Sequence, residues 1–571
     1  MSTETAAAVK PSSPPSFAEQ FTPKLVTTFR EGYRLSQLRA DAVAGLTVAI
    51  VALPLSMAIA IASGASPAQG FYTAIVGGFL VSALGGSRFQ IGGPAGAFIV
   101  LVAATVEAHG MDGLIIATLL SGLLLLAIGF LRLGAYIKFI PYPVTVGFTA
   151  GIAVIIFASQ IKDILGLDLA GPEPGPLVEK LPVLWRALPS MGWSTLALAG
   201  LTILSIQWLK RRAPRVPGML AAIAGAAAAT ALWDLPVDTV GSRFGGIPSG
   251  FPAFRVPDFS LAKAYAVFPS AVAFTLLGAI ESLLSAVVAD GMTGQRHRSN
   301  CELVAQGVAN IGSALCGGIC VTGAVARTAT NVRAGAHGPV AGMLHAVFLL
   351  IFILVAAPLA SYIPLASLAG VLAIIAWNMV EKQAFWTLLR ASRGDAAVLL
   401  STFGLTVFRD LTEAIVVGFA LGSMLFIHRM SQVTAVETRK PFVPDDGADD
   451  AGEDGRPYDE RSMNDPDIVV YRISGVFFFG AAGTVGSVLD HIGDRRRALV
   501  IDFSMVPFAD ATAANTMEAV VRKAAARGIA VYFSGLSPAV RREFFMHGLR
   551  PPRVRYESSI ATALSKARRA G

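Results

Sequence analysis

Residues 89–102 read FQIGGPAGAFIVLV, an apolar segment whose middle is broken by the Gly-Gly-Pro of residues 92–94. Residues 318–331, GICVTGAVARTATN, have the same design, with the break at residues 322–323. A continuous membrane helix gains nothing from such a break, because Pro removes a backbone donor and Gly loosens the turn. Inside a bilayer, non-helical backbone is tolerated only where protein buries it or where it lines a polar cavity. Paired breaks in two halves of a chain are typical of the midplane site of a secondary transporter.

The composition around these two segments is that of a polytopic membrane protein. The chain has 571 residues, of which 54% are hydrophobic and 15% charged, and its mean hydropathy is +0.61. An average soluble domain has about 25% charged residues. The net charge of +8 does not indicate nucleic acid as a partner, because the Lys and Arg residues lie at the ends of apolar runs. The three cysteines share one apolar region, which predicts neither a disulfide framework nor a metal site.

Apolar runs that we interpret as membrane spans recur along the first 428 residues, seven in each half of this region. An odd number per half inserts the second half upside down relative to the first, which is an inverted repeat. The runs lie near 41–62, 69–85, 93–106, 112–133, 142–161, 193–209, 217–233, 266–289, 302–319, 325–336, 339–360, 364–380, 395–409 and 411–428.

The orientation follows from the basic residues. With residue 1 inside, Arg88 and the cluster at 210–215 fall on the inner side, whereas the short outer loops near 63–68 and 108–111 contain no Lys or Arg. The first 40 residues lack the apolar core of a cleavable signal peptide. We therefore expect a multi-pass protein of the inner (plasma) membrane, with both chain ends in the cytoplasm.

The composition changes after the last apolar run. Residues 429–466 are acidic and contain Gly and Pro, which predicts a solvated linker. Residues 467–571 alternate strand-like and helical patterns, which predicts a small α/β domain. The predicted organisation is a cytoplasmic segment (1–40), a transmembrane domain (41–428), the linker and this final domain.

Two long motifs, AGLTVAIVALPLSMAIAIASGASPAQGFYTAIVGGFLVSALGGSRFQIGGPAGAF and AIESLLSAVVADGMTGQRHRSNCELVAQGVANIGSALCGGICVTGAVARTATNVRAG, resemble the signature regions of the SulP family of anion transporters. The last 105 residues resemble its C-terminal STAS domain. The resemblance implies a 14-span fold of the uracil-permease type, in which a core (spans 1–4 and 8–11) moves against a gate (spans 5–7 and 12–14). It also implies a homodimer with cytoplasmic STAS domains and an anion held between half-helices 3 and 10. Leu55 and Ile59 depart from the polar and aromatic residues of some animal relatives.

The residues themselves also favour an anion. Each helix N-terminus is equivalent to roughly half a positive charge, and two facing each other form a cradle for an oxyanion. The expected helices begin at Pro94, presenting the amides of Ala95, Gly96 and Ala97, and near Ala324, presenting those of Val325, Ala326 and Arg327.

Arg327 is the most informative charge, because Arg at mid-membrane costs about 2.5 to 3.5 kcal/mol on insertion scales and should have a partner or a ligand. The alternatives are an ion pair with Glu281 or a position nearer the membrane interface. By resemblance, Arg327 matches a basic residue that attracts the substrate. Ser56, Thr322 and Thr328 are candidate hydroxyl donors, although such hydroxyls also bond their own helix backbone.

Three further residues have predicted roles. Glu281, in the middle of a predicted span, matches an acidic residue associated with proton or cation coupling, and the alternative is a pair with Arg327. Asp290 is expected to cap a helix or to contact Arg296 or Arg298. Thr512 is a possible regulatory site, because soluble relatives of the STAS fold have a phosphorylated Ser there, and the alternative is a helix N-cap.

The sequence therefore predicts secondary active transport of a small oxyanion, sulfate foremost, driven by protons or sodium through an elevator-like movement. No Walker motif is present, and neither enzymatic activity nor a cofactor is expected. Bicarbonate and C4-dicarboxylates such as fumarate or succinate stay open as substrates. A nucleobase permease, an anion channel and a membrane regulator acting through its STAS domain are the other possibilities.

Overall fold

The computed structural model describes residues 16–134, 141–171, 173–174, 177–213, 217–247, 250, 254, 257–409, 411–433, 435–438, 467–478 and 497–569. The chain divides into two compact units, Met1–Ala420 and Leu421–Gly571.

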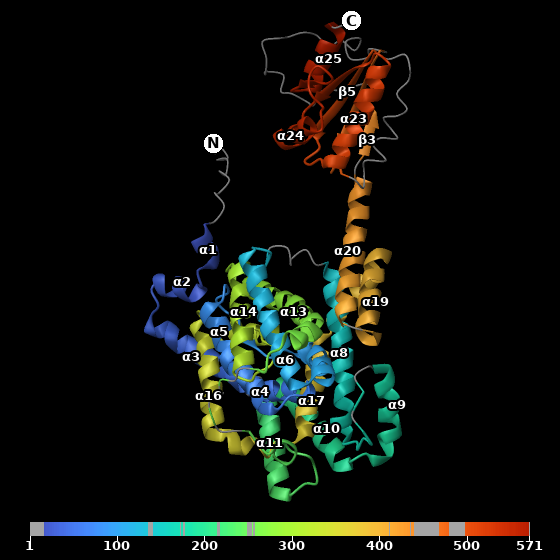
Figure 1. The fold of residues 1–571 in the computed structure, drawn as a ribbon. Coiled ribbons are helices and arrows are strands. Elements are labelled where there is room, and N and C mark those ends of the chain that lie inside the picture. Colours follow the sequence, from blue (N-terminus) through green and yellow to red (C-terminus); the bar gives the residue numbers. More distant parts are fainter. Residues whose placement is uncertain are drawn as a thin grey trace. The chain divides into compact units, whose positions relative to one another are not determined.

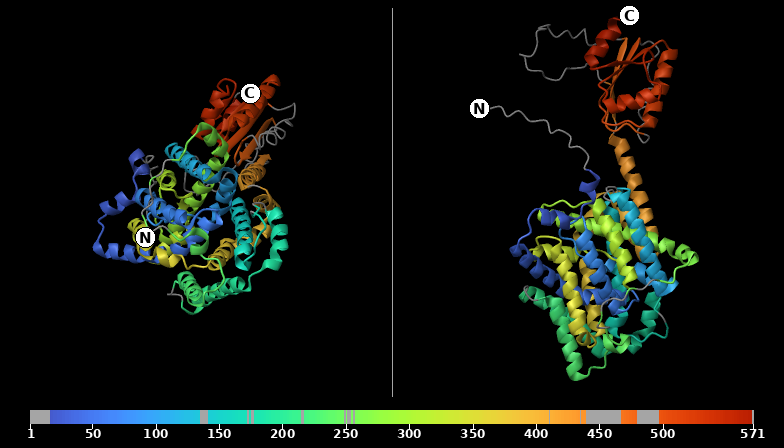
Figure 2. Two further views of the ribbon diagram at one scale, coloured as in Figure 1. Left: turned by 60° about the horizontal axis from the view of Figure 1, so that its bottom comes forward. Right: turned by 60° about the vertical axis from the view of Figure 1, so that its left-hand side comes forward.

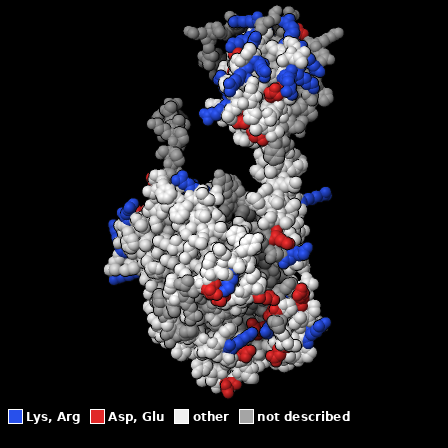
Figure 3. All heavy atoms as spheres, viewed as in Figure 1, with Lys and Arg blue, Asp and Glu red and all other residues white. Residues whose placement is uncertain are grey.

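The first unit is a bundle of apolar helices (Figures 1 and 2). On the face shown in Figure 3, charged side chains are sparse over most of this unit, as expected for a surface in contact with lipid. Its helices are α1 (Phe17–Phe21), α2 (Lys24–Arg30), α3 (Leu35–Ala62), α4 (Pro67–Tyr72), the π-helix η1 (Thr73–Gly77), α5 (Gly78–Leu84), the 3₁₀ turn η2 (Gly96–Phe98), α6 (Ile99–Phe130), α8 (Tyr142–Leu165), α9 (Leu177–Ala187), η3 (Leu188–Ser190), α10 (Trp193–Arg212), α11 (Gly218–Trp233), α12 (Val240–Phe244), α13 (Leu261–Thr293), α14 (Ser299–Leu315), α15 (Val325–Arg333), α16 (Val340–Ala360), α17 (Leu365–Met379), α18 (Lys382–Ala391), α19 (Arg393–Phe408) and α20 (Leu411–Val433), the last of which continues into the second unit.

Eight helices within the described ranges are long and apolar enough to cross a bilayer. A ninth results if the bent pair Leu177–Ser190 and Trp193–Arg212, with 113° between them, is one span. The predicted spans 93–106 and 112–133 meet within α6, which consists of two helices joined by a kink at Gly110, whose φ is 68°. Short elements such as α15 and α11 account for further differences from the predicted fourteen, and that number stays a prediction.

Helices separated in sequence lie against one another in this unit: α6 against α13 and α14, α3 against α16, and α8 against α17 and α19. Two glycines permit the last of these contacts. A Cβ at Gly147 would lie 2.5 Å from the Leu399 carbonyl oxygen, and one at Gly151 would lie 2.6 Å from Thr406. The Gly-x-x-x-Gly spacing of α8 therefore serves close packing on α19.

The second unit contains a five-stranded sheet. Its order is β3 (Ala435–Thr438), β4 (Ile468–Ser474), β5 (Ala498–Met505), β6 (Ala530–Ser534) and β7 (Arg555–Glu557), with β3 antiparallel to β4 and the others parallel. β3 lies within the range predicted as linker, which the composition did not reveal. Residues 481–493, which belong to the predicted α/β domain, fall outside the described residues.

Helices cover both faces of this sheet. Leu499, Ile501 and Phe533 pack on one face with α23 (Ala511–Ala526) and α24 (Pro538–Met546). Val500 and Tyr532 pack on the other face with α25 (Ile560–Arg569). The alternation of buried side chains along β5 and β6 explains why these short apolar runs are strands covered on both sides.

Candidate functional site

The two interrupted segments meet. Gly92–Gly93 forms the strand β1, which pairs antiparallel with β2, Thr322–Gly323, so that Gly92 lies opposite Gly323 and Gly93 opposite Thr322. The Ala324 N–H donates to the Ile91 carbonyl oxygen at 2.9 Å, which extends the ribbon by one bond. Backbone groups that would be unpaired inside a membrane are thereby satisfied across the two halves of the unit.

The first helix begins slightly later than predicted. Ala95 is extended, with φ −117° and ψ 146°, and the 3₁₀ turn of Gly96–Phe98 precedes α6. The first bond of this turn runs from the Phe98 N–H to the Ala95 carbonyl oxygen at 3.1 Å. The amides of Ala95, Gly96 and Ala97 precede that bond, so the turn does not use them as donors.

The second helix begins where the sequence predicts. Ala324 is the N-cap residue and α15 starts at Val325. The first intrahelical bond runs from the Thr328 N–H to the Ala324 carbonyl oxygen at 2.9 Å, which leaves the amides of Val325, Ala326 and Arg327 before it. Since β1 and β2 are paired, both helix N-termini follow directly from one ribbon.

Arg327 lies at this ribbon and is 1% exposed. Its Nη2 donates to Ser56 Oγ at 3.2 Å, whereas Nε and Nη1 have no hydrogen-bond partner in the described parts of the chain. Gly93 passes so close that a Cβ there would collide with Arg327 Nη1. No ion pair joins Arg327 to Glu281 within the described residues. Arg327 is thus a buried cation with two unused donors beside two helix N-termini.

The threonine hydroxyls hold the ribbon in place. Thr328 Oγ1 accepts from the Ile91 N–H at 3.1 Å and from Ser285 Oγ at 3.0 Å. Thr322 Oγ1 lies 2.8 Å from Ser282 Oγ, which in turn accepts from the Gly323 N–H at 3.1 Å. The two serines of α13 were missed by sequence reasoning, because their partners are 40 to 43 residues away along the chain.

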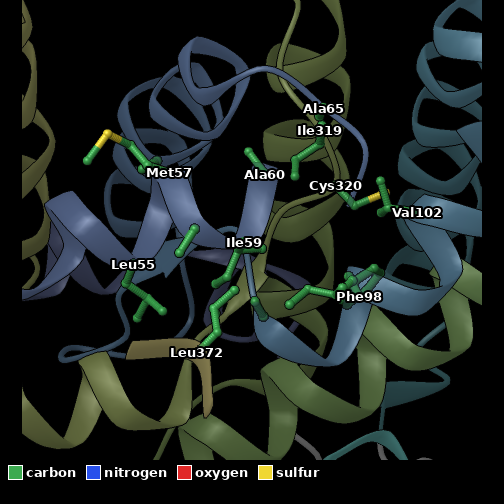
Figure 4. Close-up of a cluster of buried hydrophobic side chains, with 14 of the residues drawn as sticks. Leu55, Met57, Ile59, Ala60, Ala65, Phe98, Val102, Ile319, Cys320 and Leu372 are labelled. Atoms are coloured by element: carbon green, nitrogen blue, oxygen red, sulfur yellow. The ribbon is translucent and has the colours of Figure 1, made fainter. Parts of the chain in front are cut away.

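An apolar wall of buried side chains adjoins the site residues along the chain. Leu55 and Ile59 of α3 belong to one buried cluster with Phe98 and Leu372, and Figure 4 shows these side chains gathered together. A wall of this kind lowers the local dielectric, so electrostatic attraction between the Arg327 guanidinium and an anion is stronger there than in water.

Glu281 belongs to α13 and directly precedes Ser282, but its carboxyl makes no contact with Arg327 among the described residues. It lines a small cavity of about 20 Å³ together with Thr145 and Thr149 of α8. Such a volume holds roughly one water molecule. Among the described residues, no hydrogen bond or ion pair of the Glu281 carboxyl is found, and no group of three His, Cys, Asp or Glu side chains is arranged as a metal site. The structure therefore does not show the alternative pair with Arg327.

Two secondary expectations differ from the structure. Asp290 contacts neither Arg296 nor Arg298, because its Oδ2 accepts from the His297 N–H at 3.1 Å and lies 2.6 Å from His297 Nδ1. Arg298 instead donates to the Thr22 carbonyl oxygen at 2.6 Å. Thr512 is exposed and is not the cap of α23, since Asp510 accepts from the Ala513 N–H at 2.8 Å and takes that role. Residue 512 is the second residue of the helix, which explains why its hydroxyl is not the capping group.

Comparisons with known families match both units. The model of the sulfate permease family matches residues 38–402, and that of the STAS domain matches residues 463–563. A putative sulfate transporter of Bacillus subtilis, YvdB, is 38% identical over 85% of this chain and 88% of its own length. The bicarbonate transporter BicA of a Picosynechococcus strain is 31% identical over 88% of this chain and 90% of its own length.

Solved structures agree with the fold. The structure of SLC26A9 superimposes with a TM-score of 0.84 at 17% identity, covering 96% of this chain and 93% of that one. The transmembrane domain of a cyanobacterial bicarbonate transporter, BicA, superimposes with a TM-score of 0.61 at 31% identity, covering 67% of this chain and 98% of that one.

Proposed function

The chain belongs to the sulfate permease family and has its C-terminal STAS domain, and we propose that it is a secondary active transporter of a small oxyanion, sulfate foremost. The observation that carries the proposal is the ribbon of β1 and β2, which sets two helix N-termini beside Arg327. Nε and Nη1 of this guanidinium are buried and have no partner in the described part of the chain. A buried cation with spare donors is satisfied by a bound anion.

The proposed binding residues are Ser56 through its contact with Arg327, the backbone of Pro94 to Ala97, the N-cap Ala324 and the first residues of α15 from Val325 to Thr328. For Thr328 we propose no contact through the hydroxyl, because this group already accepts hydrogen bonds from the Ile91 N–H and from Ser285. The anion would therefore meet amide N–H groups and the guanidinium. Such donors select charge more strongly than shape.

Coupling is assigned to Glu281. Its carboxyl lines a cavity between α13 and α8, and these helices fall in the proposed core and gate, respectively. A proton or a sodium ion bound there would sit where the two parts slide past each other in an elevator-like movement. The proposal includes the fourteen spans, a homodimer in the inner membrane, a cytoplasmic STAS domain and the predicted domain boundaries.

Uptake into proteoliposomes examines the proposal directly. Labelled sulfate, bicarbonate and fumarate are offered at two pH values, with and without a sodium gradient. We expect saturable uptake of sulfate that depends on one of the two gradients. Uptake of none of the three anions would remove the proposed function.

Bicarbonate is the second candidate, because two relatives named bicarbonate transporters are 31% and 32% identical over 88% of this chain. A competition assay separates bicarbonate from sulfate. An excess of one unlabelled anion is added during uptake of the other, labelled anion, and the substrate of the transporter is the anion whose excess suppresses uptake. C4-dicarboxylates enter the same assay through fumarate. Single-channel conductance would instead support an anion channel, and function retained without residues 1–428 would support a STAS-based regulator.

A further inference from the structure

The loop that leads into β1 is held by residues of the second half of the unit. Gly86 lies on the first turn of α14, where its carbonyl oxygen accepts from the Arg298 N–H at 2.9 Å and a Cβ would lie 2.9 Å from the Glu302 nitrogen. Further along, Asn331 Nδ2 donates to the Phe89 carbonyl oxygen at 2.9 Å. The loop therefore has its anchors in α14 and α15.

Glu302 is the centre of this anchorage. The side chain is 0% exposed and accepts four hydrogen bonds: from the N–H groups of Gly86 at 2.9 Å and Ser87 at 3.1 Å, and from the amides of Gln90 at 2.9 Å and Gln306 at 3.1 Å. An ionised carboxylate is an acceptor only, with room for about four donors. Its hydrogen-bonding capacity is therefore filled by the protein.

The Glu302 carboxylate also fixes the orientation of the Gln90 and Gln306 side chains. Both direct their NH₂ groups at Glu302, and the Oε1 atoms of Gln90 and Gln306 are left without a partner among the residues described. Turning either amide would bring its oxygen against the carboxylate, which would cost more than the bond that it gained.

Gln90 connects this cluster to the ribbon. It precedes Ile91, whose N–H donates to Thr328 and whose carbonyl oxygen accepts from Ala324. The Gln90 amide also fills the space beside Gly323, where a Cβ would collide with it. A shift of Gln90 would therefore displace β1 relative to β2, and with it the helix N-termini and the Gly93 backbone beside Arg327.

We propose that Glu302 is a positioning residue for the anion site, acting through Gln90 and the loop of residues 86–91 to hold the two helix N-termini in register. The inference rests on the proposed anion site. Glu302 does not touch the anion. It fixes the distance between the groups that do.

The experiment uses the full chain and measures sulfate affinity by equilibrium binding of the labelled anion. Glu302→Gln places an NH₂ group among four donors, so we expect affinity to fall by about tenfold or more while the purified protein keeps its monodisperse elution. Glu107→Gln, at an exposed position in α6, is the matched control and should stay within about twofold of wild type. A merely structural role would lower thermal stability without changing affinity in the folded fraction.

A double-mutant cycle supplies the second readout. Gln90→Leu removes one donor to Glu302, and combined with Glu302→Gln it should cost much less than the product of the two single effects, because both act on one network. If Glu302→Gln does not assemble, Gln90→Leu and Gln306→Leu must each weaken binding for the inference to stand. Wild-type affinity in these variants would overturn the inference about Glu302 and leave the proposed function standing. Absence of sulfate, bicarbonate and fumarate binding by the wild-type protein would overturn the proposed function instead.

Discussion

Arg327 and Glu302 are two buried charges in the same unit, and the protein treats them in opposite ways. The Glu302 carboxylate receives four hydrogen bonds from its own chain. Arg327 donates one hydrogen bond, to the Ser56 hydroxyl, and its Nε and Nη1 have no partner within the described residues. Burying a charge is expensive unless it is compensated. A charge that is fully compensated by the chain serves structure, and one that is compensated in part leaves capacity for a ligand.

The largest expected effect is that of Arg327→Ala. It removes the only partly compensated charge of this pair, and we expect sulfate affinity to fall by more than about a hundredfold, since each hydrogen bond from a charged group contributes roughly 1.5 to 3 kcal/mol. Equilibrium binding of labelled sulfate measures the change. Thermal unfolding should show a folded protein, because the substitution also removes an incompletely satisfied cation. Unchanged affinity would refute the site.

Gly93→Ala should have the next largest effect. The new Cβ would collide with Arg327 Nη1, so the guanidinium or the strand has to move. Overpacking of this kind costs about 1 to 3 kcal/mol. Relief of the collision by displacing the guanidinium from the anion should lower affinity by roughly fivefold to a hundredfold. Gly200→Ala in α10, where a Cβ meets nothing within 4 Å, is the control. Equal affinity in both variants would show that the spacing between Gly93 and Arg327 does not matter for binding.

Ser56→Ala removes the one hydroxyl that orients Arg327. We expect a loss of a few-fold to about tenfold in sulfate affinity, because the bond from Nη2 is lost but the charge remains. Thr47→Ala, which deletes a hydroxyl bonded to the Val43 carbonyl oxygen of its own helix, should leave affinity unchanged. An effect of equal size at both positions would mean that α3 packing, and not the orientation of Arg327, was disturbed.

Glu281→Gln should change affinity least. Glu281 makes no ion pair with Arg327 in the described structure, so binding at equilibrium should stay within about threefold of wild type. Transport should lose its dependence on the driving gradient, because the carboxyl lines the cavity assigned to the coupling ion. Uptake measured against pH and sodium decides this point, and an unaltered dependence on both would contradict the assignment.

The loop before β1 also reaches the unit's surface. Arg88 Nη2 lies 2.5 Å from Glu31 Oε1, and this hydrogen bond holds the pKa of the Glu31 carboxyl below its usual range. The contact is exposed at Glu31 and is screened by salt, so it contributes little to stability. The buried hydrogen bonds of Glu302 should therefore contribute more to stability than the exposed contact of Arg88 with Glu31, and they should depend less on salt.

Part of this arrangement was accessible from the sequence. The two breaks, the helix start near Ala324 and the choice of Arg327 as a charge within an apolar region follow from residue types, because Gly and Pro interrupt helices and a charge in an apolar run requires an explanation. The role of Arg327 in binding stays a prediction. The start of the first helix was placed two to five residues early, since Pro94 suggests an N-terminus while Ala95 remains extended.

The rest depends on contacts that no local pattern reveals. The Glu302 cluster joins residues more than 200 positions apart, and Ser282 and Ser285 find their partners across a helix and a strand. One signal was present: Glu302, Gln306 and Asn310 are spaced four residues apart, about one helical turn, among apolar residues, which indicates a buried polar face. The partner of Asp290 was missed because His297 lies in the loop between α13 and α14, whose geometry the sequence does not specify.

The pairing of β1 with β2 has a consequence for biosynthesis. The Ile91 N–H pairs with Thr328, which is synthesised 237 residues later. The amides and carbonyls of the first break therefore leave the ribosome long before their hydrogen-bond partners have been synthesised. Until then they must be held by water, by lipid headgroups or by the insertion machinery, because hydrocarbon offers them nothing. A chain that ends before residue 322 should therefore be unstable in the membrane, because these backbone groups stay unpaired. Cellular quality control could recognise an incomplete chain by these unpaired groups.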